Sequence, residues 1–394
     1  MPFYSNKAIN KLGPMLKSGK VNYWSGSEGK KFEEEFSKYL GNKFSVALSN
    51  GSVALEIALR ALNLKKGDEI IVSPRSFIIS ASCAINLGLK PIFADVDTDG
   101  NLCIEGIKKV HKNNVKAIIL VHLNGLPCDL DPITKFAKKN KLFLIEDCSQ
   151  AHGAVYKGKK VGSFGDISTW SFCQDKIIST GGEGGMISTN NRQLWLKCWS
   201  LKDHGKNYNS VFFKKHKIGF RWHHHNFGSN HRMTEMQAIL GREQLKILDY
   251  QVKKRNVIAN LYLNGLKEYF KKHEILKNPN FKNRYASKIK DKKLKNKNVH
   301  AFYRLSLFIN EKKLNQLKLL EQLKLNKINS GVGACPEIYR EKIFQNLKLR
   351  PKKRLLNAKL LGETSITFPI DPNRSIAKVK LEIKSIKKVL NKFL

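Results

Sequence analysis

The chain has 394 residues, 41% of them hydrophobic, and its 72 Lys and Arg against 32 Asp and Glu give a formal net charge of +40. This composition excludes a disordered chain and a disulfide-stapled miniprotein, and it predicts two or three domains with room for an enclosed active site. The seven cysteines show no pairing or zinc-like spacing, so we expect a reducing, cytoplasmic location. No apolar run approaches the roughly 18 residues needed to cross a bilayer, so we expect no membrane span.

The positive charge is concentrated towards the end of the chain. Residues 251–394 hold 36 Lys and Arg against 10 Asp and Glu. The lysines are scattered and are not interleaved with aromatic residues, so we expect no specific nucleic-acid partner. A small anionic substrate would benefit from the same field.

Short apolar segments alternate with segments of helical length along the first half. Residues 32–46 contain a short amphipathic helix that leads to a strand at 44–48, and another helix follows Gly51 and Ser52. Further strands are predicted at residues 69–72, 91–96, 115–122, 142–146, 167–172 and 185–188. The alternation predicts an α/β fold in which a mainly parallel, seven-stranded sheet lies between helices.

The sequence changes near Asp249 to long helices rich in Lys, Leu and Asn, with an extended segment at 301–309 and a basic stretch at 277–299. We therefore predict a large domain over residues 1–250 and a smaller α+β domain over residues 251–394. Apolar residues at alternating spacings of three and four over residues 376–393 predict an amphipathic terminal helix. We expect it to pack on its own domain, and a membrane-surface or partner helix is the alternative.

Two residues that can carry chemistry follow neighbouring strands. Asp147 comes directly after the strand at 142–146, and Lys176 follows the next strand-like segment beside a glycine-rich turn at 181–185. Ligands of such sheets gather at the carboxyl ends of the strands. On spacing alone, however, an ordinary salt bridge is the simpler interpretation.

Two further features favour a cofactor site. Gly51 and Ser52 open a helix directly after a strand, where free N–H groups attract anions, although such a turn can also be a simple helix cap. Ser171 lies five residues before Lys176 and can join the same anion site. Pyridoxal phosphate (PLP) requires this set: an amine for a Schiff base, an acid for the pyridine nitrogen and donors for the phosphate.

At the level of longer motifs, the chain resembles a known family. The strings SNGSVALEIALRAL, GDEIIVSPRSF, PIFADVD, IEDCSQAHGA, SFCQDKIISTGGEGGMIST, DHGK and FGSNHRMTEMQAILGREQL resemble, in order and spacing, the DegT/StrS-type nucleotide-sugar aminotransferases among the fold-type I PLP enzymes. The resemblance runs from about residue 15 to 250 and continues more weakly to about residue 372. It implies transfer of an amino group from an amino acid, with glutamate as the expected donor, to a keto group of a nucleoside-diphosphate-activated deoxy sugar.

The resemblance also assigns roles at individual positions. Lys176 matches the lysine that forms the Schiff base with PLP and then moves the proton between the substrate carbon and the cofactor. Asp147 matches the acid that pairs with the pyridine nitrogen, and Gln150 matches a polar residue near the ring. Some relatives that dehydrate sugars carry histidine in place of the lysine, so Lys176 favours amino transfer.

The other matched positions concern the phosphate and the ring face. Gly51 and Ser52 match the phosphate-binding loop, and Ser171 matches a hydroxyl that supplements it. Phe77 matches an aromatic residue that stacks on the ring, although it could be a plain core residue. Asn230 matches a residue that reaches the phosphate of the neighbouring subunit's cofactor, which implies a homodimer with composite sites.

Several alternatives remain open. A PLP-dependent sugar dehydratase and a non-catalytic regulatory protein on the same fold are the rival functions. The histidines at residues 223–225 invite a metal site, but only His223 and His225 would face the same side of an extended segment, so we expect no metal. Cys335 lies where relatives line the sugar pocket, and a structural loop is equally plausible there.

Overall fold

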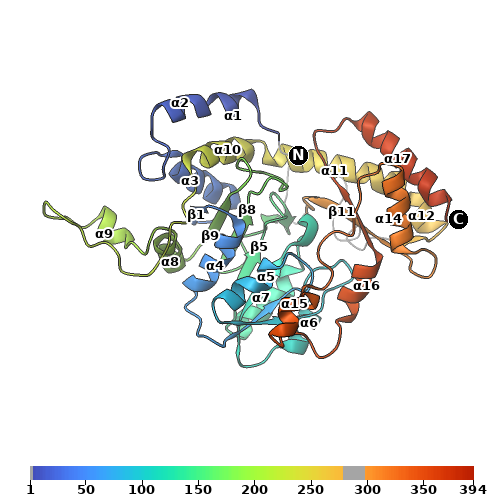
Figure 1. The fold of residues 1–394 in the computed structure, drawn as a ribbon, viewed down its shortest axis with the longest axis horizontal. Helices are drawn as coiled ribbons and strands as arrows, with labels where there is room; N and C mark the ends of the chain where they lie inside the picture. Colours follow the sequence, from blue (N-terminus) through green and yellow to red (C-terminus); the bar gives the residue numbers. More distant parts are fainter. Residues whose placement is uncertain (1–2, 278–297) are drawn as a thin grey trace.

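The computed structural model describes residues 3–277 and 298–394. Its centre is a seven-stranded sheet with the order β1-β9-β8-β5-β4-β2-β3 (Figure 1). The strands are β1 (Phe44–Leu48), β2 (Glu69–Val72), β3 (Lys90–Phe93), β4 (Val115–Val121), β5 (Phe143–Asp147), β8 (Ile167–Ser171) and β9 (Gly185–Thr189). Strand β9 runs antiparallel to both of its neighbours, and the pairings from β8 to β3 are all parallel. The predicted mainly parallel, seven-stranded sheet is confirmed.

Both faces of this sheet are buried, because successive residues of a strand point to opposite sides. Ile118 of β4 belongs to one core and Ile119 to the other. The helices that surround the sheet are α1 (Asn6–Asn10), α2 (Leu12–Lys17), α3 (Glu28–Leu40), α4 (Gly51–Ala61), α5 (Ile79–Asn86), α6 (Ile104–Val110), α7 (Leu130–Lys139), α8 (Arg192–Lys202), α9 (Tyr208–Phe212) and α10 (Glu235–Lys246). Helices α3, α6, α7 and α10 supply the first core, whereas α4, α5 and α8 supply the second.

The helix expected within residues 32–46 has different limits in the structure. Helix α3 begins at Glu28 and ends at Leu40. It stops there because Gly41 adopts a φ of 78°, a left-handed conformation that glycine allows and that turns the chain towards β1.

The last third of the chain builds a third core around a small antiparallel sheet. Its elements are α11 (Leu248–Gly265), α12 (Lys267–Lys271), β10 (Leu276–Lys277), β11 (Arg304–Ile309), α14 (Gln316–Leu325), α15 (Lys342–Asn346), α16 (Leu356–Thr364), β12 (Ser365–Pro369) and α17 (Ile376–Asn391). Helix α17 buries Val379, Ile383 and Ile386 in this core beside α11 and α14, so the predicted terminal helix packs on its own domain. Most of the basic stretch at 277–299 lies outside the described residues.

Short elements complete the fold: β6 (Val155–Tyr156), β7 (Lys159–Lys160), η1 (Leu123–Gly125) and η2 (Ile338–Arg340). Part of the C-terminal third returns to the large sheet, since Tyr339 and Phe344 pack against Phe93. The division at residue 250, just after α11 begins at Leu248, therefore stays a prediction. Within the described residues, no helix combines the length and the apolar character needed to cross a membrane.

Candidate active site

A cavity of about 720 Å³ opens where strands β4, β5 and β8 end and helix α4 begins. Eight of the residues singled out from the sequence line it: Gly51, Ser52, Phe77, Asp147, Gln150, Ser171, Lys176 and Cys335. They meet because parallel strands bring their carboxyl ends to one edge of the sheet. Asn230 is not among the lining residues.

The start of α4 forms the anion-binding end of the cavity. The Asn50 side chain accepts the N–H of Val53 at 2.9 Å, which caps the helix and leaves the first N–H groups, those of Gly51 and Ser52, without an intrahelical acceptor. A Cβ atom on Gly51 would lie 2.6 Å from the Cβ of Ser171. Glycine thus lets the Ser171 hydroxyl approach the positive end of the helix.

Asp147, the last residue of β5, forms the floor of the cavity and is 5% exposed. Burial raises the pKa of Asp147, and hydrogen bonds from Ser149 together with the charge of Lys176 offset this only in part. The Ser149 N–H donates to Asp147 Oδ1 at 3.0 Å. No cation forms an ion pair with Asp147 in the described part of the chain. A protonated pyridine nitrogen is the kind of partner that this carboxylate lacks.

Lys176 stands in a small network that the sequence did not reveal. Its Nζ lies 3.3 Å from the Asp175 carboxylate and 5.1 Å from the centre of the Tyr303 ring. The Tyr303 hydroxyl donates to Asp175 Oδ2. Burial lowers the pKa of Lys176, but Tyr303 and Asp175 outweigh it, so this pKa is raised. Burial raises the pKa of Asp175, yet the Tyr303 hydroxyl and Lys176 bring it below its usual value.

Phe77 and Gln150 form walls of the cavity. The Phe77 side chain is 68% exposed, so its ring faces open space and does not fill a core. Gln150 Oε1 accepts the Asn124 N–H at 2.7 Å, and Asn124 Nδ2 donates to Ser306 Oγ at 2.8 Å. Gln150 therefore links the cavity to β11 of the small sheet.

Asn230 lies at the base of an arm, residues 205–229, that carries α9 and projects away from the body of the molecule (Figure 1). Its backbone pairs with Asp203, and its side chain is exposed. Asp203 Oδ1 accepts hydrogen bonds from Arg232 at 2.6 Å and Lys206 at 3.2 Å. Asp203 thus ties together the two ends of the arm and fixes Asn230 between them.

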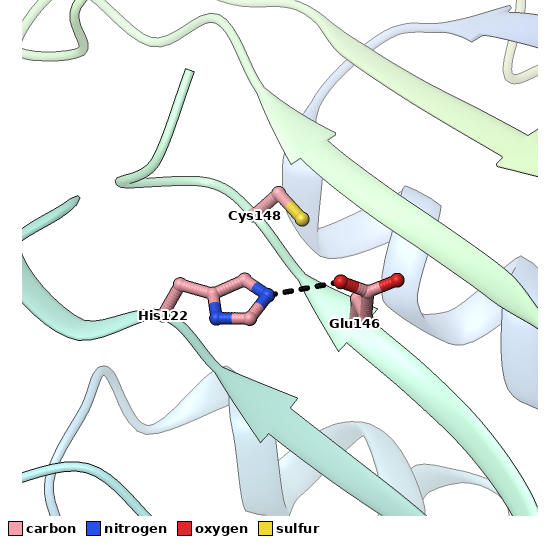
Figure 2. Close-up of side chains that lie close together, drawn as sticks. All are labelled: His122, Glu146 and Cys148. Atoms are coloured by element: carbon pink, nitrogen blue, oxygen red, sulfur yellow. Dashed lines mark hydrogen bonds and ion pairs between the residues drawn. The ribbon is translucent and has the colours of Figure 1, made fainter. Parts of the chain in front are cut away.

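A second polar cluster lies beside Asp147 within the core, where His122 faces Glu146, with Cys148 close by (Figure 2). His122 Nδ1 accepts the Cys128 N–H at 3.1 Å, so Nε2 carries the proton that is donated to Glu146 at 3.0 Å. Burial raises the pKa of Glu146, but the hydrogen bond from His122 and backbone N–H groups lower it below its usual value.

The Glu146 carboxylate also accepts three backbone N–H groups at 2.7–2.8 Å. Hydrogen bonds therefore occupy both nitrogens of His122 and the carboxylate oxygens of Glu146. For this reason the cluster fits a structural hydrogen-bond network better than a metal site. His223 of the arm bonds Ser210 Oγ through Nδ1 at 3.0 Å. Within the ranges that the structure describes, neither His223 nor His225 belongs to a group of three potential metal ligands.

Comparison with known proteins identifies the family of this chain. A profile of the DegT/DnrJ/EryC1/StrS aminotransferase family matches residues 4–387. The chain belongs to this family. GDP-perosamine synthase of Escherichia coli O157:H7 is 38% identical over 70% of this chain and 73% of that protein. A UDP-N-acetyl-3-dehydro-alpha-D-glucosamine 3-aminotransferase of Acidithiobacillus ferrooxidans is 39% identical over 56% of each chain.

The solved structure of an aminotransferase from Psychrobacter cryohalolentis superposes with a TM-score of 0.93, at 41% identity, over 100% of this chain and 98% of that chain. This DegT/DnrJ/EryC1/StrS member is therefore an aminotransferase that depends on PLP, as the sequence predicts. The cavity fits that cofactor, because a buried acid lacking a cation, a lysine amine and an anion-binding helix end all face it.

Proposed function

We propose that the protein transfers an amino group from an amino acid, with glutamate as the donor, to a keto group of a nucleotide-activated deoxy sugar. The observation that carries this proposal is the convergence of Lys176, Asp147 and the Gly51–Ser171 anion site in one cavity. The named relatives act on GDP- and UDP-linked sugars. At about 720 Å³, the cavity is within the range of about 300–1,000 Å³ that holds drug-sized ligands.

When bound, PLP supplies the electron sink for the chemistry. We propose that Asp147 holds a proton at the ring nitrogen, because its buried carboxylate is stabilised by a positive charge there. Lys176 Nζ then moves a proton at the substrate carbon as general base and acid. Asp175 and Tyr303 keep that Nζ in place, since Asp175 is 3.3 Å from it and accepts the Tyr303 hydroxyl.

The remaining residues would bind and orient the cofactor. The N–H groups of Gly51 and Ser52 and the Ser171 hydroxyl would hold its phosphate, and the exposed ring of Phe77 would cover one face of the pyridine. Gln150, tied to Asn124, would keep the loop beside the ring in place.

A homodimer is part of the proposal. Asn230 lies outside the cavity of its own chain, so it can act at a phosphate only in a neighbouring copy. The arm beside it exposes large apolar side chains that a monomer would leave in water, namely Phe213, Ile218, Phe220, Trp222 and Phe227. The seven cysteines are free, which accords with the cytoplasmic location that we also propose.

The test is transfer of ¹⁵N from labelled glutamate to a GDP- or UDP-linked keto sugar, followed by mass spectrometry. The proposal requires a labelled amino sugar that does not form with Lys176→Ala. Loss of a sugar hydroxyl without gain of nitrogen would instead identify a dehydratase. A protein that neither retains cofactor nor changes any sugar would be a binding protein.

A further inference from the structure

A second cavity, of about 640 Å³, lies on the other side of Lys176. It shares Asp175, Lys176, Tyr303 and Arg304 with the first cavity. Its other walls are formed by Tyr4, Gln174, the 181–182 turn, Arg255 of α11, residues 329–331, Thr367 and residues 369–371. The Lys176 amine therefore stands where two cavities meet and can be approached from both.

Arg255 is a buried cation in the wall of this second cavity. It is 8% exposed, and its Nη1 donates to the carbonyl oxygens of Phe302 at 3.2 Å and Ile370 at 2.5 Å. Its Nε has no hydrogen-bond partner, and no described carboxylate forms an ion pair with it. Burial lowers the pKa of Arg255 to about 10, and the charge of Asp371 offsets this only in part. Neutral carbonyl groups do not balance such a charge, so an anion in the cavity would be stabilised.

Arg304, the first residue of β11, adds a second guanidinium. Its Cζ lies 5.2 Å from the centre of the Tyr303 ring, and it makes no ion pair within the described ranges. Asp175 is already engaged by Lys176 and Tyr303, which leaves Arg255 and Arg304 against Asp371 in the cavity wall. The balance of one positive charge matches a single carboxylate better than a diphosphate. The planar fork of arginine also suits a carboxylate.

We propose that the second cavity binds a carboxylate of the amino donor through Arg304 and Arg255. The inference rests on the proposed function, which supplies an amino acid as donor, and it goes further by assigning that donor a binding site of its own. The donor would thus reach Lys176 from the second cavity and the nucleotide sugar from the first, and Arg255 would anchor the donor alone.

The first test follows the visible absorption band of the bound cofactor as glutamate is added. Arg304→Gln should raise the glutamate concentration needed for half of the change by about tenfold or more. Arg255→Lys keeps the buried positive charge but loses the planar guanidinium group, and it should raise this glutamate concentration as well. Arg340→Gln removes a charge from an exposed side chain that lines neither cavity, and it should leave this concentration unchanged.

The second test measures binding without chemistry, by calorimetry with glutarate and, separately, with GDP and UDP. Both variants should weaken glutarate binding, and Arg255→Lys, at a residue that lines only the second cavity, should leave nucleoside diphosphate binding unchanged. Weakened nucleotide binding with unchanged glutarate binding would overturn the inference and assign the cavity to the diphosphate. If glutamate changes the band of all four proteins equally, the inference fails while the proposed function stands. If the wild-type band does not respond to glutamate, the proposed function itself fails.

Discussion

Gly51 and Ser171 approach each other so closely that a Cβ atom on Gly51 would lie 2.6 Å from the Ser171 Cβ and 3.1 Å from its Oγ. Helix α4 and strand β8 thus meet through a residue without a side chain, at the point where the cavity would hold a phosphate. The approach is a steric requirement, because Gly51 is not at one of the positive-φ positions.

Gly51→Ala should therefore displace Ser171 and weaken PLP binding by about tenfold or more, while overpacking lowers stability by about 1–3 kcal/mol. Gly265→Ala is the matched control, because Gly265 is also helical and an added Cβ there would lie 2.6 Å from Ile383 Cγ2, at a position that lines neither cavity. Cofactor titration and thermal unfolding of both variants measure the effects. Equal cofactor affinity in the two variants would contradict the assignment of Gly51.

Asp147→Asn should make the cofactor-free protein more stable and the enzyme less active. Because burial raises the pKa of Asp147 above its usual 3.8, folding favours the protonated form, and the charged form costs stability at neutral pH. The increase in Tm caused by the substitution should reach its maximum at a pH above the raised pKa of Asp147, and it should vanish as the pH falls below about 3.8. The rate of the glutamate reaction should fall by about 100-fold or more, because the ring nitrogen loses its acid. A variant that is less stable at pH 7 would contradict this account.

Glu146→Gln should have the opposite effect on stability. Burial raises the pKa of Glu146, but His122 and the backbone donors lower it overall, so the ionised form stabilises the fold. We expect a loss of about 3 kcal/mol at pH 7, measured by urea unfolding. This difference should be full above the usual pKa of 4.5 and shrink as the pH falls through the lowered value. A difference that stays constant with pH would mean that Glu146 acts through its shape alone.

Replacing Phe220 and Trp222 together by Ser should convert the proposed dimer to a monomer. Both side chains are largely exposed on the arm, so the change should alter the stability of the monomer by only about 0.5 kcal/mol. Leu325→Ser, at an equally exposed position on α14, is the control and should leave the association unchanged. Light scattering over a range of concentrations measures the mass. Persistence of the dimer in the double variant would show that the arm does not hold the copies together.

The sequence located the sheet well because its strands are short, apolar and regularly spaced. The predicted strand at 69–72 coincides with β2, and the extended segment at 301–309 contains β11. The predicted limits of α3 were wrong, because the prediction began at Phe32, the first residue of its apolar stripe, and continued past Gly41, which ends the helix. Helix α9 was missed because it has only five residues, too few to show a helical periodicity in the sequence.

In the active site, Lys176 and Asp147 could be found because each follows a recognisable strand. Tyr303 could not, because its contact with Asp175 joins residues 128 positions apart and depends on how the small sheet packs against the large one. The second cavity could not be predicted either, because its walls come from distant segments of the chain. Arg255 and Arg304 also lie among many other cationic residues in a strongly basic segment. Only the folded structure shows that these two arginines line a cavity, whereas most other cationic residues of the segment lie at the surface.

The most direct test of the central claim is the visible absorption spectrum of the purified protein before and after addition of glutamate, recorded alongside Lys176→Ala. The account predicts a band from bound PLP that glutamate abolishes in the wild type, and a different spectrum in the variant, whose cofactor lacks the lysine attachment. A wild-type protein that shows no such band even after incubation with PLP, or a Lys176→Ala protein with the same band and the same response to glutamate, would contradict it.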